Sequence, residues 1–216
     1  MKLTQRLEMT ASLVEKGKRL ADIGTDHAYL PVFLVLNNTV PEAIASDLRK
    51  GPLENARATV KEYLLEDKIE LRLSDGFDNY YPSEADNYVL AGMGGILMTE
   101  LVRRTDWLKN PDLKLIFQPQ SHSHILRKYL CENGFEIRNE LTCSEGRRLY
   151  TAFDCIFTGR AETYSEHYYY FGNLESKNDP VSVAFVKKQK DKLEKEMLAL
   201  KNSGNDWSKI ETILKG

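Results

Sequence analysis

Four short segments of this 216-residue chain each run from apolar residues into acids or glycines. They are residues 19–26 (RLADIGTD), 43–47 (AIASD), 69–76 (IELRLSDG) and 88–95 (YVLAGMGG). Apolar runs of this length that end in Gly, Asp or Ser are typical of buried parallel strands. Residues just past the carboxyl ends of such strands line the ligand crevice of a doubly wound sheet. The sequence therefore predicts one crevice that collects acids and glycines, which suits a nucleotide-like cofactor.

Several acids lie at positions from which they could bind the ribose and the adenine of a cofactor. Asp47 lies 23 positions after Gly24, a spacing typical of the acid that binds ribose hydroxyls in Rossmann-type sites. Asp75 and Gly76 suit the edge of an adenine, whose amine can donate to a carboxylate or a carbonyl. A structural alternative stays open for each acid, because Asp22 could bond loop amides and Asp47 or Asp75 could cap a helix.

The loop after the first segment indicates which cofactor to expect. A dinucleotide site would show G-x-G-x-x-G, but residues 24–29 read GTDHAY. Asp26 would repel a pyrophosphate, whereas it would attract the ammonium and sulfonium charges of S-adenosylmethionine. We therefore expect Gly24, Thr25 and His27 to bind S-adenosylmethionine and not NAD, although His27 could equally make a local loop bond.

Strands and helices alternate strictly along the first part of the chain. The predicted strands are 19–24, 43–47, 69–73, 88–91 and 114–117, followed by a closing hairpin of 135–141 and 149–157. Alternation of this kind implies a parallel sheet with right-handed crossovers. The prediction is a doubly wound, mostly parallel, seven-stranded α/β sheet that occupies residues 1–160.

The composition changes after Gly159, and residues 161–216 predict an appended helical hairpin. Asp179 and Pro180 are typical of a helix start. A heptad seam is expected at Val183, Val186, Leu193, Met197 and Leu200. Because its charges balance, a solvated helical pair that packs on itself or on the sheet domain is the default, and RNA docking or dimer formation stays open. We expect a monomer or a weak homodimer.

Composition argues against several classes of protein. No apolar run approaches the roughly 18 residues of a membrane span, and residues 1–6 lack the apolar core of a signal peptide. Cys131, Cys143 and Cys155 form no CxxC pair, so they predict reduced thiols in a cytoplasmic protein and no metal site. A net charge of −2 gives no global attraction to nucleic acid, so RNA binding would need local patches.

Three blocks carry a resemblance to a known family. Residues 22–31 (DIGTDHAYLP), 91–95 (AGMGG) and 118–120 (QPQ) closely resemble the bacterial tRNA (adenine-22-N1)-methyltransferase family. The similarity spans the sheet domain and continues into the helical hairpin. It implies a class I methyltransferase fold, S-adenosylmethionine as methyl donor, and N1 of an adenine in the D-arm region of tRNA as acceptor.

The block after the fourth strand has no side chain that could accept a proton. Adenine N1 has a free lone pair and no proton to lose, so its methylation needs no base. The methylated base gains positive charge, which a nearby carboxylate would stabilise in the transition state. Asp26 is the candidate for this catalytic role. Gly92, Met93 and Gly94 are expected at the cofactor, and Gly94 with Gly95 would let the adenine approach. The glycines could also form a tight turn between strand and helix, and both readings can hold together.

N1 of a paired adenine becomes accessible when the base is unpaired and extruded. Residues that could stack on or read the base are Tyr29, Phe77, Gln118, Pro119 and Gln120, although either aromatic ring could pack in the core instead. Local cations available to the RNA backbone are Arg6, Lys50, Arg103, Arg104, Arg147 and Arg148. Further candidates to dock tRNA near the hairpin are Tyr164, Tyr168, Tyr169, Tyr170, Lys187, Lys188 and Lys192.

Two other functions stay open at this point. The chain could methylate another position in tRNA or ribosomal RNA. Alternatively, it could be a non-catalytic module that binds S-adenosylmethionine or RNA. Gly24, Asp47 and Asp75 favour a working cofactor site in every case.

Overall fold

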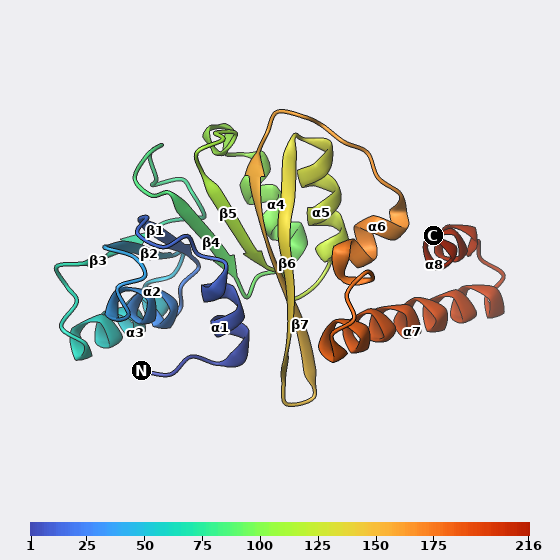
Figure 1. Ribbon diagram of the computed structural model, residues 1–216, viewed down its shortest axis with the longest axis horizontal. Coiled ribbons are helices and arrows are strands. Elements are labelled where there is room, and N and C mark those ends of the chain that lie inside the picture. Colours follow the sequence, from blue (N-terminus) through green and yellow to red (C-terminus); the bar gives the residue numbers. More distant parts are fainter.

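The sheet at the centre of the protein has seven strands in the order β3-β2-β1-β4-β5-β7-β6 (Figure 1). The computed structural model describes residues 1–216. The strands are β1 (Leu20–Ile23), β2 (Ala43–Asp47), β3 (Ile69–Leu73), β4 (Asn87–Ala91), β5 (Lys114–Gln118), β6 (Phe135–Glu145) and β7 (Arg148–Phe157). Neighbouring strands pair in parallel from β3 to β5, whereas β7 runs antiparallel to both β5 and β6. The doubly wound sheet with a closing hairpin that the sequence predicts is confirmed.

Helices cover both faces of this sheet. They are α1 (Gln5–Ser12), α2 (Tyr29–Leu36), α3 (Lys50–Glu62), α4 (Gly95–Arg103), α5 (Ser123–Glu132), α6 (Glu166–Phe171), α7 (Pro180–Asn202) and α8 (Ser208–Lys215), with short 3-10 helices at η1 (Asp106–Leu108) and η2 (Gly172–Leu174). Side chains of β1 alternate between two cores: Leu20 packs with α1, α2 and α3, whereas Ala21 and Ile23 pack with α4 and α5. None of the helices combines the length and apolar character needed to cross a bilayer.

The order of the strands reverses at β1 and β4. Strands β2 and β3 extend the sheet on one side of β1, and β5 extends it on the other side, beyond β4. In doubly wound sheets the ligand crevice forms at such a switch point, outside the carboxyl ends of the strands. Ile23 and Ala91 are those ends, so the loops that begin with Gly24 and Gly92 flank the switch point.

The C-terminal segment contains three helices and not the expected hairpin alone. Helices α6, α7 and α8 surround a small core of their own, and Asp179 caps α7 by accepting from the Ser182 amide at 2.9 Å. The predicted heptad seam is partly wrong, because Val183 is 52% exposed and Phe185 is buried instead. Helix α7 packs against β6, β7 and η2 as well as α8, so its buried stripe follows several neighbours and not one helical partner.

A buried ion pair fixes the C-terminal helices to the sheet. Arg127 of α5 pairs with Glu140 of β6 and also donates to the carbonyl of Tyr169 in α6. The same carboxylate accepts from the amide of Asn173 at 2.9 Å. Gly172 has φ of +58°, and a side chain there would collide with Glu140. The α6–η2 corner is therefore shaped around this carboxylate.

Candidate active site

The first loop, residues 24–28, depends on backbone conformations that favour glycine. Gly24, Asp26 and Ala28 have φ values of +78°, +52° and +54°. The amides of Gly24 and Thr25 both donate to the Ser46 carbonyl at 2.8 Å, which ties the loop to the end of β2. A Cβ atom on Gly24 would collide with Cε of Met93. The loop therefore contacts the ends of both strands that neighbour β1.

Asp22 is a buried carboxylic acid directly beneath this loop. Its residue is only 5% exposed, and burial raises the pKa of the carboxyl group from 3.8 to about 6. The Thr25 hydroxyl donates to Asp22 at 2.6 Å, and this bond together with the positive charge of Arg6 opposes the shift. Asp22 thus keeps a negative charge at neutral pH, but at a cost in stability.

Arg6 reaches from α1 into the crevice, although the sequence suggested a role on the RNA backbone. Its Nη1 donates to Oε1 of the buried Gln118 at 2.8 Å, and its guanidinium lies 5.9 Å from the ring centre of Tyr150. A Cβ atom on Gly92 would lie 3.6 Å from both Arg6 Nη1 and Gln120 Nε2. Arg6 and Gln120 therefore both lie beside Gly92, and Gln118 holds Arg6 there.

The glycine block and the segment after β5 form one continuous wall. The joining backbone bonds run from Gly92 N to Gln118 O at 3.1 Å, from Gln120 N to Met93 O at 2.8 Å and from Gly95 N to Ser121 O at 2.7 Å. A Cβ atom on Gly94 would lie 3.2 Å from the Ser121 hydroxyl, which is a tight contact, and Pro119 is buried. Gly95 is also buried, and a side chain there would collide with the His122 backbone. Its small size thus serves this packing, and its place beside the acceptor base stays a prediction.

Asp47 and Asp75 follow β2 and β3 on the same edge of the sheet. Asp47, whose side chain is 12% exposed, accepts from the Arg49 amide at 2.8 Å and makes no capping bond to α3. Asp75 is half-exposed, and Arg104 donates to its carboxylate at 2.8 Å and to its carbonyl at 2.7 Å. Gly76, at φ of +57°, lies where a Cβ atom would collide with Leu101.

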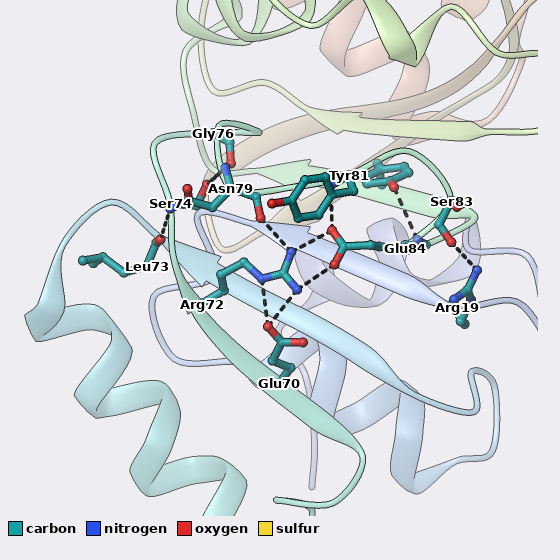
Figure 2. Close-up of polar contacts among 12 residues, drawn as sticks. Arg19, Glu70, Arg72, Leu73, Ser74, Gly76, Asn79, Tyr81, Ser83 and Glu84 are labelled. Carbon is teal, nitrogen blue, oxygen red and sulfur yellow. Dashed lines mark hydrogen bonds and ion pairs between the residues drawn. The ribbon is translucent and has the colours of Figure 1, made fainter.

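Arg72, which the sequence analysis did not select, organises the segment that carries Asp75 (Figure 2). Its guanidinium bonds Glu84 at 2.8 and 2.9 Å, Glu70 at 2.7 Å and the Asn79 carbonyl at 2.8 Å. Asn79 in turn donates to the Leu73 carbonyl at 2.7 Å. The alternation of Ile69, Leu71 and Leu73 could have indicated that Arg72 and Glu70 share the other face of the strand.

Phe77 lies in the core and cannot stack on an RNA base. Its side chain is 2% exposed and meets Tyr80, Tyr88 and Trp107 edge to face, with ring centres 5.6 to 6.2 Å apart. Tyr169 is likewise buried, at 1% exposure. The alternative of core packing is therefore correct for Phe77, and the prediction that Tyr169 stacks on an RNA base is wrong.

Asp26, His27 and Tyr29 form an exposed lip on the first loop. The Asp26 side chain is 62% exposed, and its carboxylate lies 3.6 Å from His27 Nε2. The His27 ring stacks on Tyr29 with a centre separation of 5.0 Å and an angle of 6° between the planes. The lip thus offers one carboxylate and an aromatic pair beside the crevice.

A groove of about 660 Å³ lies between the segment 119–124, β7 and α7. Arg148, Lys188 and Lys192 bring positive charge to its walls, whereas Arg147 is exposed in the β6–β7 turn. His124 stacks on Tyr170 at 4.1 Å, and burial lowers the pKa of His124 to about 4. Figure 1 shows the β6–β7 hairpin between α1 and α7. The groove thus adjoins the wall at Gln120 and carries a neutral aromatic stack.

Comparisons with known proteins extend over most of the sheet domain. A family model described as a methyltransferase domain matches residues 3–153. The tRNA (adenine(22)-N(1))-methyltransferase of Bacillus subtilis (strain 168) is 33% identical over 150 residues. The matched part makes up 69% of this chain and 63% of the length of that protein.

Solved structures extend the similarity to the C-terminal helices. The crystal structure of the B. subtilis tRNA methyltransferase TrmK has a TM-score of 0.85 at 26% identity, covering 99% of this chain and 94% of that one. Sp1610 of Streptococcus pneumoniae, in complex with S-adenosyl-L-methionine, has a TM-score of 0.84 at 29% identity, covering 99% and 100%. Helices α6 to α8 therefore belong to the shared fold.

Proposed function

Because the chain belongs to the methyltransferase-domain family and is similar to the tRNA (adenine(22)-N(1))-methyltransferase of B. subtilis, we propose that it transfers a methyl group from S-adenosylmethionine to N1 of adenine 22 in tRNA. One observation carries the proposal: the first loop and the glycine block meet at the switch point of the sheet, where Gly24 lies against Met93. With tRNA as the substrate, we expect the reaction to take place in the cytoplasm.

The residues around the crevice fit S-adenosylmethionine. When bound, this cofactor supplies an electrophilic methyl group on a sulfonium centre. Gly92 has a φ of +83° and no side chain, so it lets a ligand approach the backbone between Arg6 and Gln120. Asp47 would bind the ribose hydroxyls and Asp75 the adenine amine. Asp22 and Asp26 would attract the ammonium and sulfonium charges, whereas a pyrophosphate would meet only repulsion there.

The acceptor side of the crevice suits a nucleophile that needs no base. The wall contributes the exposed amide group of Gln120, which can bond the edge of a nucleobase, and residues 92–95 include no acid or histidine. Gln118 and Pro119 are buried, so the prediction that they read or stack on the base is wrong. Tyr29 offers a surface on which a base can stack. Asp26 would stabilise the positive charge that develops on the adenine as N1 gains the methyl group.

The groove would receive the backbone of the tRNA. Arg148, Lys188 and Lys192 would meet phosphates, and the His124–Tyr170 stack would contact a neighbouring nucleotide. The groove and the crevice lie on one chain, so we propose that a monomer is sufficient for activity.

Unmodified tRNA transcripts that differ only at position 22 test the proposed function. With labelled S-adenosylmethionine, the transcript with adenine is expected to gain a methyl group at N1 of that base, and a transcript with guanine none. Methylation of both transcripts would indicate another acceptor position. Cofactor binding without methylation of either would indicate a non-catalytic module.

Calorimetry on Asp47→Ala tests the placement of the ribose. Loss of a hydrogen bond to a charged group is expected to weaken cofactor binding by about 1.5–3 kcal/mol. The control is Asp67→Ala, which removes an exposed acid from the turn before β3. Equal affinities for both variants would refute the assignment of Asp47.

A further inference from the structure

A cavity of about 340 Å³ lies outside the crevice, between the first residues of the chain, the start of α2 and the end of α3. Figure 1 shows the N-terminus beside α2 and α3, on the side of the molecule away from α7, so the cavity is separate from the groove. Its walls are mainly apolar, and the larger side chains among them are Leu3, Leu7, Tyr29 and Tyr63. Its volume is at the lower end of the about 300–1,000 Å³ that is typical of small-ligand sites.

Tyr29 connects this cavity to the lip of the first loop. Its ring stacks on His27 with the ring centres 5.0 Å apart and an angle of 6° between the planes, so one face of the ring is covered. Tyr29 is nevertheless 44% exposed and lines the cavity. No other residue of the cavity wall belongs to the lip or to the crevice. A ligand in the cavity is therefore separated from the lip by one side chain.

The walls favour a flat, uncharged ligand such as a nucleobase. Tyr63 directly follows α3 and is partly buried against the core, which holds its ring in the wall. Bases of any sequence stack on aromatic side chains. Lys2 and Glu62 carry opposite charges at the cavity, so its walls have no net charge and suit a base better than an ion.

Extrusion of an acceptor base disturbs the strand on both sides of that base. A base that leaves its stack uncovers one face of each neighbouring base. A second site close to the first can hold such a neighbour and so keep the stack from closing again. The cavity is suited to this role, because only Tyr29 lies between it and the rest of the lip.

We propose that this cavity binds the base of a nucleotide adjacent to adenine 22 in tRNA, with Tyr63 as the stacking surface and Tyr29 as the wall shared with the lip. The inference rests on the proposed function, since it takes a tRNA with an extruded adenine as the substrate. It gives the first residues of the chain and the end of α3 a part in substrate recognition.

Binding of tRNA transcripts that lack one base tests the proposal. Fluorescence anisotropy with S-adenosylhomocysteine present measures affinity without turnover, for the complete transcript and for transcripts without the base at position 21 or 23. The unmodified protein is expected to bind one of the two roughly tenfold more weakly than the complete transcript. Tyr63→Leu should bind the complete transcript roughly tenfold more weakly and lose little further affinity when that base is absent.

Two further variants serve as controls. Tyr63→Phe keeps an aromatic ring and should behave as the unmodified protein does. Tyr81→Leu removes a tyrosine that is 72% exposed and does not line the cavity, so this variant should keep the full cost of removing the base. Calorimetry with S-adenosylmethionine should give one affinity for all of these proteins, because the cavity lies outside the crevice.

Each other outcome overturns the proposal in a different way. Weakening of all transcripts by one factor in Tyr63→Leu would indicate that Tyr63 only packs against the core. Equal binding of all transcripts by the unmodified protein would leave the cavity to a protein or a small molecule. Weaker cofactor binding by Tyr63→Leu would show that its effect on tRNA is indirect. If the complete transcript is not methylated, the proposed function itself is wrong, whereas methylation without a base-specific loss of affinity refutes only the second base site.

Discussion

The crevice and the groove are built by different means. In the crevice, Gly24 and Gly92 adopt left-handed backbone conformations, and Gly95 packs where no Cβ atom fits. In the groove, exposed cations such as Lys188 and Lys192 project from a helix into open space. The residues of the crevice are closely packed, so substitutions there are poorly tolerated. In the groove several cations attract the RNA together, so the loss of one of them has a smaller effect. Cofactor geometry thus depends on the backbone, and RNA affinity on surface charge.

The largest expected effect concerns the buried acid of the crevice. Between pH 4 and 6 the folded protein holds a proton on Asp22 that the unfolded chain has lost, because the pKa rises from 3.8 to about 6. Stability therefore falls as pH rises through this range, and the loss is complete above it. Asp22→Asn should stabilise the cofactor-free protein at pH 7 by at most about 3 kcal/mol while weakening cofactor binding.

Urea unfolding of both proteins across this pH range measures the effect. The difference in the free energy of unfolding between Asp22→Asn and the unmodified protein should shrink as the pH is lowered toward 4. An equal difference at all pH values would show that Asp22 does not titrate as its burial predicts.

The packing of the glycine block predicts the next effect. Gly95→Ala places a methyl group against the His122 backbone, which has little room to move, and overpacking of this kind costs about 1–3 kcal/mol. The matched control is Gly51→Ala, since a Cβ atom there meets nothing within 4 Å and helix propensity favours alanine. Urea unfolding should show a loss for the first variant and a small gain for the second. Two equal changes would contradict the crowding at Gly95.

The proposed electrostatic role of Asp26 predicts a change in rate. Asp26→Asn keeps the shape of the loop but removes a charge that is 62% exposed to solvent, so we expect a roughly tenfold loss in the single-turnover rate. Cofactor affinity should change less. Asp67→Asn provides the control for a general loss of negative charge. An unchanged rate would move the role to Asp22 or to a purely positional mechanism.

The smallest effect is expected in the groove. Replacing both Lys188 and Lys192 with alanine should raise the KM for tRNA about five- to tenfold and reduce its dependence on salt, while leaving cofactor affinity unchanged. Lys187→Ala is the matched control, because Lys187 is exposed on the same helix but does not line the groove. An equal effect of Lys187→Ala would show that the net charge of α7 matters and not the groove.

Local sequence patterns were sufficient to predict the strands and the acids that follow them. The apolar runs before Gly24, Asp47 and Asp75 specify buried strands, and parallel pairing then brings their carboxyl ends to one edge. The beginning of α7 at Asp179 and Pro180 was equally local, since the cap depends only on neighbouring residues.

Tertiary contacts explain what the sequence could not reveal. Arg6 and Gln118 are 112 positions apart, and no periodic pattern connects them. Exposure of an aromatic ring depends on the elements that pack over it, so Phe77 and Tyr169 could not be distinguished from Tyr29. The exposure of Val183 also depends on tertiary packing. Its heptad position predicted burial against one helix, but α7 packs against several elements.

The ion pair between Arg127 and Glu140 limits how this protein can be divided for fragment studies. A fragment that ends near residue 153, where the family match ends, would lack the Tyr169 carbonyl and the Asn173 amide that complete the pair. It would also expose two buried charges and part of the sheet. Replacing Arg127 and Glu140 together with apolar residues of similar volume is therefore the rational first step toward an isolated sheet domain for ligand screening.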